Sequence, residues 1–223
     1  PISMVENHIV DYAIVGADKA LIAISNNAPI RIISVDQQRN PVGWIVRSSL
    51  GITSFKDIQG RKDIILGDKS GTEISSILQL ILKRTPYDLN PQAVNYDFDY
   101  FLTNKNVVYP VYLNEEPEKA KLIHSLSVSE IDPSLEINGG IKLYGNVLIT
   151  HQDKVKTSLS EVHEVIDGII KGWEFASENP DEAVKIVNKY VKHDERYVKA
   201  VMKRSVYFAK NKYGEEVPPG HMD

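Results

Sequence analysis

A strand, a glycine-bounded turn and a helix follow one another in residues 62–84, whose sequence is Lys-Asp-Ile-Ile-Leu-Gly-Asp-Lys-Ser-Gly-Thr-Glu-Ile-Ser-Ser-Ile-Leu-Gln-Leu-Ile-Leu-Lys-Arg. Residues 62–66 are short and mostly apolar, which is typical of a buried strand. In residues 73–84 the apolar side chains recur every three or four positions and therefore share one helix face. They are Ile74, Ile77, Leu78, Ile81 and Leu82. The segment predicts a strand–turn–helix unit of an α/β fold.

The same alternation extends through the first two thirds of the chain, and the last third is helical. Further strands are expected at residues 11–16, 30–35, 41–47, 107–112 and 143–150, and further helices at 18–25, 159–178, 182–192 and 195–210. Asp18 is the expected N-cap of its helix, because a short carboxylate can accept the free N–H groups there. A turn is expected at residues 138–140 (Asn-Gly-Gly) and a loop at 213–223.

The composition excludes several classes of protein. The 223 residues are 42% hydrophobic and 25% charged, as in an ordinary globular chain. The net charge of −4 gives no general attraction to nucleic acid or to an anionic membrane, and no apolar run approaches the ~20 residues that span a bilayer. There is no cysteine, which excludes disulfides, thiol catalysis and Cys-ligated metals.

The turn at residues 67–72 (Gly-Asp-Lys-Ser-Gly-Thr) is the first candidate site. Free backbone N–H groups at a helix start, together with the hydroxyls of Ser70 and Thr72, can hold an anion or the polar edge of a heterocycle. The spacing is not that of a P-loop. The alternative interpretation is an ordinary capped connection between a strand and a helix.

A second candidate site lies in residues 109–117 (Tyr-Pro-Val-Tyr-Leu-Asn-Glu-Glu-Pro), at the end of an expected strand. Ligands of open α/β sheets bind at the carboxyl ends of the strands. Tyr112 could stack on a flat ligand, and Asn114 and Glu115 could hydrogen-bond ring nitrogens. Alternatively, Tyr112 belongs to the core and Glu116 only begins a helix.

Nothing in the residues requires catalysis. The adjacent Glu115 and Glu116 point to different faces of a regular element and make a poor acid–base pair. The six histidines are scattered and show no metal-binding spacing. Trp44 and Tyr144 each remain either a ring platform for a ligand or a core residue.

Several segments, taken in order, resemble one family. They are residues 11–18 (Asp-Tyr-Ala-Ile-Val-Gly-Ala-Asp), 28–31 (Ala-Pro-Ile-Arg), 40–43 (Asn-Pro-Val-Gly), 55–62 (Phe-Lys-Asp-Ile-Gln-Gly-Arg-Lys), 70–73 (Ser-Gly-Thr-Glu), 112–117 (Tyr-Leu-Asn-Glu-Glu-Pro), 144–148 (Tyr-Gly-Asn-Val-Leu) and 172–183 (Gly-Trp-Glu-Phe-Ala-Ser-Glu-Asn-Pro-Asp-Glu-Ala). Together they resemble the NMT1/THI5-like periplasmic binding proteins, a group that takes sulfonates, nitrate or thiamine pyrimidines.

The resemblance implies a two-lobed type II periplasmic binding protein-like fold of the α/β class. Residues 1–46 and 149–223 would form lobe 1, and residues 47–148 would form lobe 2. Family members carry one more strand–helix–strand segment ahead of the position of Pro1, so the resemblance implies that this chain lacks that segment.

The residues that would contact the ligand by this resemblance are Asp18, Trp44, Ser70, Gly71, Thr72, Tyr112, Asn114, Glu115 and Tyr144. The first two would line lobe 1, the next three would donate hydrogen bonds from a helix start, and the following three would meet the edge of a heterocycle. Tyr144 would close the pocket from the returning strand. No metal or cofactor is implied.

The function that the resemblance implies is an extracytoplasmic solute-binding protein of an ABC importer. It would clamp a small nitrogen heterocycle, such as a pyrimidine thiamine precursor or a flavin-like ring, and would deliver it to the membrane subunits of the transporter. Any membrane anchor would lie outside these residues. The alternative is the ligand-sensing extracytoplasmic domain of a histidine kinase or another signalling protein. The pyrimidine-forming enzymes of the family carry a Cys-rich iron motif, which this cysteine-free chain lacks.

Overall fold

The computed structural model of the chain describes residues 1–136 and 141–222, so the turn expected at residues 138–140 lies outside the described residues. The chain divides into two compact units. Unit 1 contains Pro1–Asn40 and Leu143–Asp223, and unit 2 contains Pro41–Lys142. The chain therefore leaves unit 1 after Asn40 and returns to it at Leu143, six residues earlier at each crossing than the expected 46/47 and 148/149.

Unit 1 is built on a three-stranded sheet. Its strands are β1 (Tyr12–Gly16), β2 (Ile30–Val35) and β8 (Asn146–His151), in the order β1-β8-β2. Both β1 and β2 pair with β8 in the antiparallel sense, so β1 and β2 run in the same direction. Their carboxyl ends therefore lie at one edge of the sheet.

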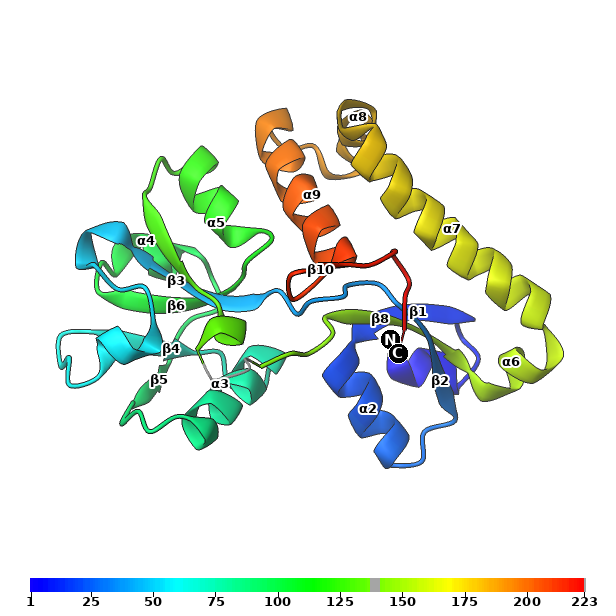
Figure 1. The fold of residues 1–223 in the computed structure, drawn as a ribbon, viewed down its shortest axis with the longest axis horizontal. Coiled ribbons are helices and arrows are strands. Elements are labelled where there is room, and N and C mark those ends of the chain that lie inside the picture. The colour runs from blue at the N-terminus through cyan, green and yellow to red at the C-terminus, as the bar shows by residue number, and fades with distance from the viewer. Residues whose placement is uncertain (137–140, 223) are drawn as a thin grey trace. The chain divides into compact units, whose positions relative to one another are not determined.

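Helices cover this sheet and continue beyond it. The short α1 (Ile2–Glu6) and α2 (Ala17–Ser25) contribute Val5, Ala17 and Ala20 to an apolar core with Ile30 and Ile149. After β8 the chain forms α6 (Gln152–Thr157), α7 (Leu159–Glu178), α8 (Pro180–Val191) and α9 (Glu195–Lys210), which are yellow-green to red in Figure 1. The helical character expected for the last third of the chain is confirmed.

The expected loop at residues 213–223 is partly wrong. β9 (Asn211–Lys212) and β10 (Glu215–Glu216) form a small antiparallel hairpin around Tyr213 and Gly214, which both have positive φ. The segment after it returns to β2, where Gly220 makes a bridge to Val35. The hairpin is too short to give a periodic sequence signal.

Unit 2 is built on a five-stranded mixed sheet in the order β5-β4-β6-β3-β7. The strands are β3 (Val42–Arg47), β4 (Ile65–Asp68), β5 (Pro91–Ala93), β6 (Val107–Tyr112) and β7 (Val128–Ile131). β4 is parallel to both β5 and β6, and β3 is antiparallel to β6 and β7.

Short helices connect the strands of unit 2. They are the 3-10 turns Ser48–Leu50, Phe55–Ile58 and Pro133–Leu135, the helices α3 (Glu73–Arg84), α4 (Asp99–Thr103) and α5 (Glu116–Glu118), and a π-helical turn at Lys119–Ile123. α3 has the predicted bounds, and Ile74, Ile77, Leu78 and Ile81 are buried as expected. They pack in one core cluster with Leu66 and Val108 of the sheet.

Candidate functional site

The carboxyl edge of the parallel strands in unit 2 brings the two predicted loops together. β4 and β6 pair directly, with Leu66 opposite Val108. β4 ends at Asp68 and β6 ends at Tyr112, so the loops that follow them leave the same edge of the sheet. The predicted residues at this edge are Ser70, Gly71, Thr72, Tyr112, Asn114 and Glu115.

The turn before α3 leaves the start of that helix without a side-chain cap. Thr72 is the N-cap residue, but its Oγ1 donates to the carbonyl of Lys69 at 2.6 Å instead of accepting a helix N–H. Gly71 has φ +79, a left-handed conformation that favours glycine. The Oγ of Ser70 donates to Asp68 Oδ2 at 3.1 Å. The hydroxyls of Ser70 and Thr72 therefore bond within the turn.

Asp68 is a site residue that the sequence interpretation missed. Its Oδ2 accepts hydrogen bonds from Ser70 Oγ and Ser75 Oγ, both at 3.1 Å. Its Oδ1 is buried and has no hydrogen-bond partner in the described part of the chain. Ser75 lies in the first turn of α3, so a carboxylate of the chain itself already lies at the helix start that the sequence suggested for an anion.

The loop after β6 carries an exposed glutamate, Glu115, next to a half-buried one, Glu116. The backbone N–H of Tyr112 donates to Glu116 Oε2 at 2.9 Å. Burial raises the pKa of the Glu116 carboxyl, and the Tyr112 N–H opposes the shift. Glu115 is exposed, Asn114 is half-buried, and 37% of Tyr112 is exposed. Tyr112 and Glu115 are therefore accessible at this edge.

The resemblance implied that Trp44 lines lobe 1, but the structure places it elsewhere. It lies in β3 of unit 2 with 0% of its surface exposed. Its ring meets Phe55 edge-on at a centroid distance of 5.0 Å, and its Nε1 donates to the carbonyl of Gly67 at 3.1 Å. The ring is core because β3 lies inside the sheet, between β6 and β7.

The carboxyl edge of β1 and β2 in unit 1 holds a second set of polar groups. Gly145 ties the two strand ends together: its carbonyl accepts from the N–H of Ala17 at 2.9 Å, and its N–H donates to the carbonyl of Gln37 at 2.9 Å. Asp18 and Gln37 each lie two residues beyond one of these strand ends, and Gln37 contacts this glycine. A Cβ at Gly145 would lie 2.7 Å from Gln37 Oε1.

Two acceptor oxygens at this edge of unit 1 lack donors. Asp18 Oδ1 and Gln37 Oε1 are buried and have no hydrogen-bond partner among the residues that the structure describes. The prediction that Asp18 caps α2 is wrong, since Gly16 is the N-cap and Asp18 lies inside the first turn. The reason is that β1 runs directly into α2 without a loop, so the helix begins at Ala17 and its N-cap lies two residues before Asp18.

Tyr144 was expected within the strand at residues 143–150, but it lies ahead of β8 and outside any strand. It is half-buried against the core of unit 1, and Lys212 Nζ lies 5.9 Å from its ring centroid. Its carbonyl accepts from Asn40 Nδ2 at 3.2 Å. Much of the ring is used for packing, and its contact with a ligand stays a prediction.

Asp36 is a further polar group that the sequence interpretation missed. It directly follows β2, only 8% of it is exposed, and its Oδ1 accepts from Trp173 Nε1 at 2.9 Å. Burial raises the pKa of the Asp36 carboxyl, and the Trp173 N–H opposes the shift. An aspartate at a strand end is the signal that could have indicated it.

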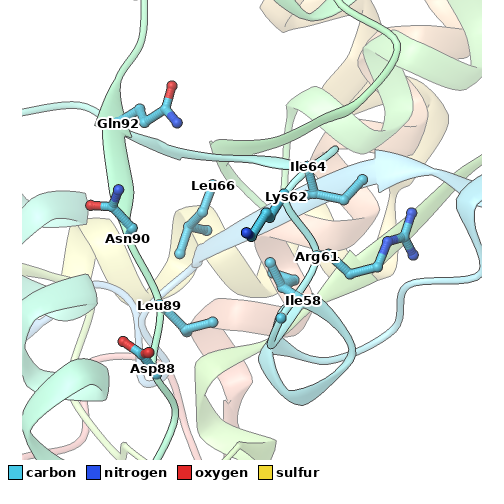
Figure 2. Close-up of a pocket in the computed structure, with 10 residues that line it drawn as sticks. Ile58, Arg61, Lys62, Ile64, Leu66, Asp88, Leu89, Asn90 and Gln92 are labelled. Atoms are coloured by element: carbon cyan, nitrogen blue, oxygen red, sulfur yellow. The ribbon is translucent and has the colours of Figure 1, made fainter.

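A pocket of about 400 Å³ in unit 2 lies at the other end of the sheet (Figure 2). Its walls include Lys62 and Ile64 just before β4, and Asn90 just before β5. Figure 2 shows Asp88, Asn90 and Gln92 along one chain segment. Because these residues mark the amino ends of β4 and β5, the pocket is separate from the predicted site residues.

The described residues show neither a metal site nor a membrane span. No group of three or more His, Cys, Asp or Glu side chains among them could hold a metal ion. No helix among them is both long and apolar enough to cross a bilayer.

Comparison with known proteins identifies a family and a fold. A family model described as NMT1/THI5 like matches residues 1–183. No curated protein matches the chain. The family match confirms the resemblance seen in the sequence.

Solved structures share the fold at low sequence identity. The alkanesulfonate-binding protein SsuA from Xanthomonas axonopodis pv. citri, bound to MOPS, has a TM-score of 0.64 and 14% identity, covering 91% of this chain and 69% of that one. The periplasmic aliphatic sulphonate binding protein SsuA from Escherichia coli has a TM-score of 0.68 and 9% identity, covering 91% and 68%. A ligand-binding component of an ABC-type import system from Staphylococcus aureus, with zinc bound, has a TM-score of 0.59 and 13% identity, covering 91% and 68%. The fold is that of periplasmic binding proteins.

Proposed function

The chain belongs to the NMT1/THI5-like family, and we propose that it acts as a binding protein, not as an enzyme, whose solute is a small nitrogen heterocycle rich in hydrogen-bond donors. The chain is a solute-binding protein of the ABC import type. Its partners are the membrane subunits of such an importer, and its place is extracytoplasmic, like that of the periplasmic neighbour from Escherichia coli. The sensor-domain alternative gains no support from these comparisons.

Buried acceptor oxygens without donors carry the proposal. Asp18 Oδ1 and Gln37 Oε1 lie at the carboxyl edge of unit 1, and Asp68 Oδ1 lies at that of unit 2. Leaving a buried acceptor without a donor costs about 1–3 kcal/mol. At either edge, taken by itself, a solute that brings amino or ring N–H groups would recover this cost, and pairing of that kind gives selectivity against solutes that lack donors.

The charge at these edges disfavours a simple anion. Asp68 lies at the start of α3, and the carboxyls of Glu115 and Glu116 follow β6 at the same edge of the sheet. A sulfonate would bring a further negative charge to an edge that already carries three carboxyl groups, and like charges placed together reduce affinity. The solute is therefore expected to differ from the alkanesulfonates of the structural neighbours.

A flat ring also fits the accessible groups of unit 2. Tyr112 ends β6 with 37% of its surface exposed, and the exposed Glu115 follows three residues later. An aromatic face can stack on a heterocycle, and a carboxylate accepts from an exocyclic amine. Both residues are expected to contact the solute.

Calorimetric titration with 4-aminopyrimidine tests this assignment. Tyr112→Ala and Glu115→Gln should each weaken binding about tenfold or more, because one loses stacking and the other a charge-assisted hydrogen bond. Glu215→Gln, at an exposed position of β10, is the matched control and should bind like the wild type. Equal affinities in all four proteins would refute the assignment of these two residues. Absence of binding to the wild type would refute the class of solute.

A further inference from the structure

Lys69 is a buried cation at the carboxyl edge of unit 2. It directly follows β4, and only 7% of the residue is exposed. Lysine is almost never buried to this extent unless its ammonium is paired, because removing the charge from water costs several kcal/mol. Lys69 lies beside the loop that carries Tyr112 and Glu115. Its charge therefore needs a compensating group at this edge.

The contacts of Lys69 compensate the charge only in part. Its Nζ lies 4.4 Å from the centroid of the Tyr109 ring. The hydroxyl of Tyr109 lies 3.0 Å from the carbonyls of Asn95, Tyr96 and Asp97, which hold the ring in place. Over the described ranges, the ammonium has no hydrogen bond and no ion pair within 4.0 Å. The attraction of a cation to a ring face is weaker than the cost of burying the charge.

Glu116 is the nearby opposite charge, but it is already engaged. Burial lowers the pKa of the Lys69 ammonium, and the Glu116 carboxylate opposes the shift. The Oε2 of that carboxylate accepts from the N–H of Tyr112. Glu116 therefore offsets the charge of Lys69 without accepting a hydrogen bond from it. The N–H groups of the ammonium remain available as donors.

The three N–H groups of the Lys69 ammonium, whose charge Glu116 offsets, suit a neutral acceptor on the solute better than an anionic one. A second anion beside Lys69 would also lie near Glu116, whereas a carbonyl oxygen brings lone pairs without charge. Asp68, which bonds to α3, and Lys69, which contacts Tyr109, offer an acceptor and a donor at the same strand end. Such a pair matches a ring that carries both an amino group and a carbonyl group.

We propose that Lys69 is a specificity residue whose ammonium donates to a carbonyl oxygen of the solute, which makes the solute an amino- and oxo-substituted nitrogen heterocycle. This inference rests on the proposed function and narrows its class of solute. Because 4-aminopyrimidine carries no carbonyl group, its binding does not test this role of Lys69.

Cytosine and 4-aminopyrimidine form the probe pair, because both carry the amino group and cytosine adds the carbonyl. Calorimetry on the wild type should show cytosine binding about tenfold more tightly. In Lys69→Met this preference should fall to about onefold, while the affinity for 4-aminopyrimidine stays unchanged. Lys62→Met removes the same charge at an exposed position before β4 and should keep the preference.

The outcomes separate the two proposals. A wild type that binds 4-aminopyrimidine but shows no preference for cytosine, or a preference that survives in Lys69→Met, overturns the role of Lys69 alone. A wild type that binds neither probe overturns the proposed function. Should Lys69→Met fail to fold, the ε-methylene signal of Lys69 in wild-type protein labelled with carbon-13 lysine is read instead. It should shift with cytosine and stay in place with 4-aminopyrimidine, and the absence of any shift with cytosine overturns the inference.

Discussion

At the scale of single residues, the buried carboxylate of Asp36 destabilises the fold near the unit 1 site. Its carboxyl is buried after β2 and is supported by one donor, the indole N–H of Trp173 at 2.9 Å. Burial disfavours the charged form of a carboxyl group, whereas hydrogen bonds donated to the carboxylate favour it. The charge of Asp36 is therefore kept at the expense of stability.

The substitution Asp36→Asn tests this cost through its pH dependence. Burial raises the folded-state pKa above its ordinary value near 3.8, so the unfolded chain ionises first as the pH rises. The stabilising contribution is present below that value and is lost as the pH rises through the folded-state pKa. Asparagine keeps an oxygen for Trp173 and does not titrate. Thermal unfolding should show the variant gaining on the wild type between pH 3 and pH 7, and a difference that is constant with pH would contradict this account.

The sequence identified residue types at the sites better than it identified burial. Tyr112 and Glu115 were correctly placed at a strand end, because loop residues after a strand can be recognised locally. Trp44 was misassigned, since the neighbours that bury it include Phe55 and Gly67, eleven and more residues away. Asp68 and Lys69 were overlooked as single residues because the contacts that matter, from Ser75 and Tyr109, form only in the folded chain.

At the scale of elements, β4 is restricted by a close approach at Gly67. A Cβ on this buried residue would lie 2.8 Å from Pro110 Cδ, 3.1 Å from the Val108 carbonyl oxygen and 3.1 Å from Val94 Cγ2. Two of these atoms belong to β6. Only glycine lets β4 lie so close to its partner while Trp44 binds the carbonyl of Gly67.

Two glycine substitutions should therefore have opposite signs. Gly67→Ala is expected to reduce the free energy of unfolding by about 1–3 kcal/mol, because the added methyl group overpacks the sheet. Gly168→Ala, in the interior of α7 with nothing within 4 Å of the new Cβ, should raise it by about 0.5–1 kcal/mol. Urea unfolding of both variants measures the pair. Equal effects of the two would show that the close approach at β4 does not restrict the residue.

Regular elements were predictable where the pattern was long. α3, α7 and α9 have the expected bounds, since their apolar stripes repeat over three turns or more. β5, α4 and the hairpin of β9 and β10 were missed because two to five residues carry no period. Their conformation is set by pairing and packing with elements that are distant in the sequence.

At the scale of the whole molecule, the chain builds unit 1 from its two ends and unit 2 from its middle. Composition does not reveal this, because β2 and β3 follow one another without a helix yet belong to different sheets. The family resemblance supplied the expectation of two lobes. Within each unit, polar groups gather where parallel strands end, and several are acceptors without donors.

The most direct test of the account is a calorimetric comparison of cytosine with ethanesulfonate on the wild-type protein at equal concentrations. The buried acceptor oxygens without donors and the nearby carboxylates should favour cytosine over the sulfonate. We expect saturable binding of one cytosine per chain and no measurable heat from ethanesulfonate. Saturable binding of ethanesulfonate with none of cytosine would contradict the account.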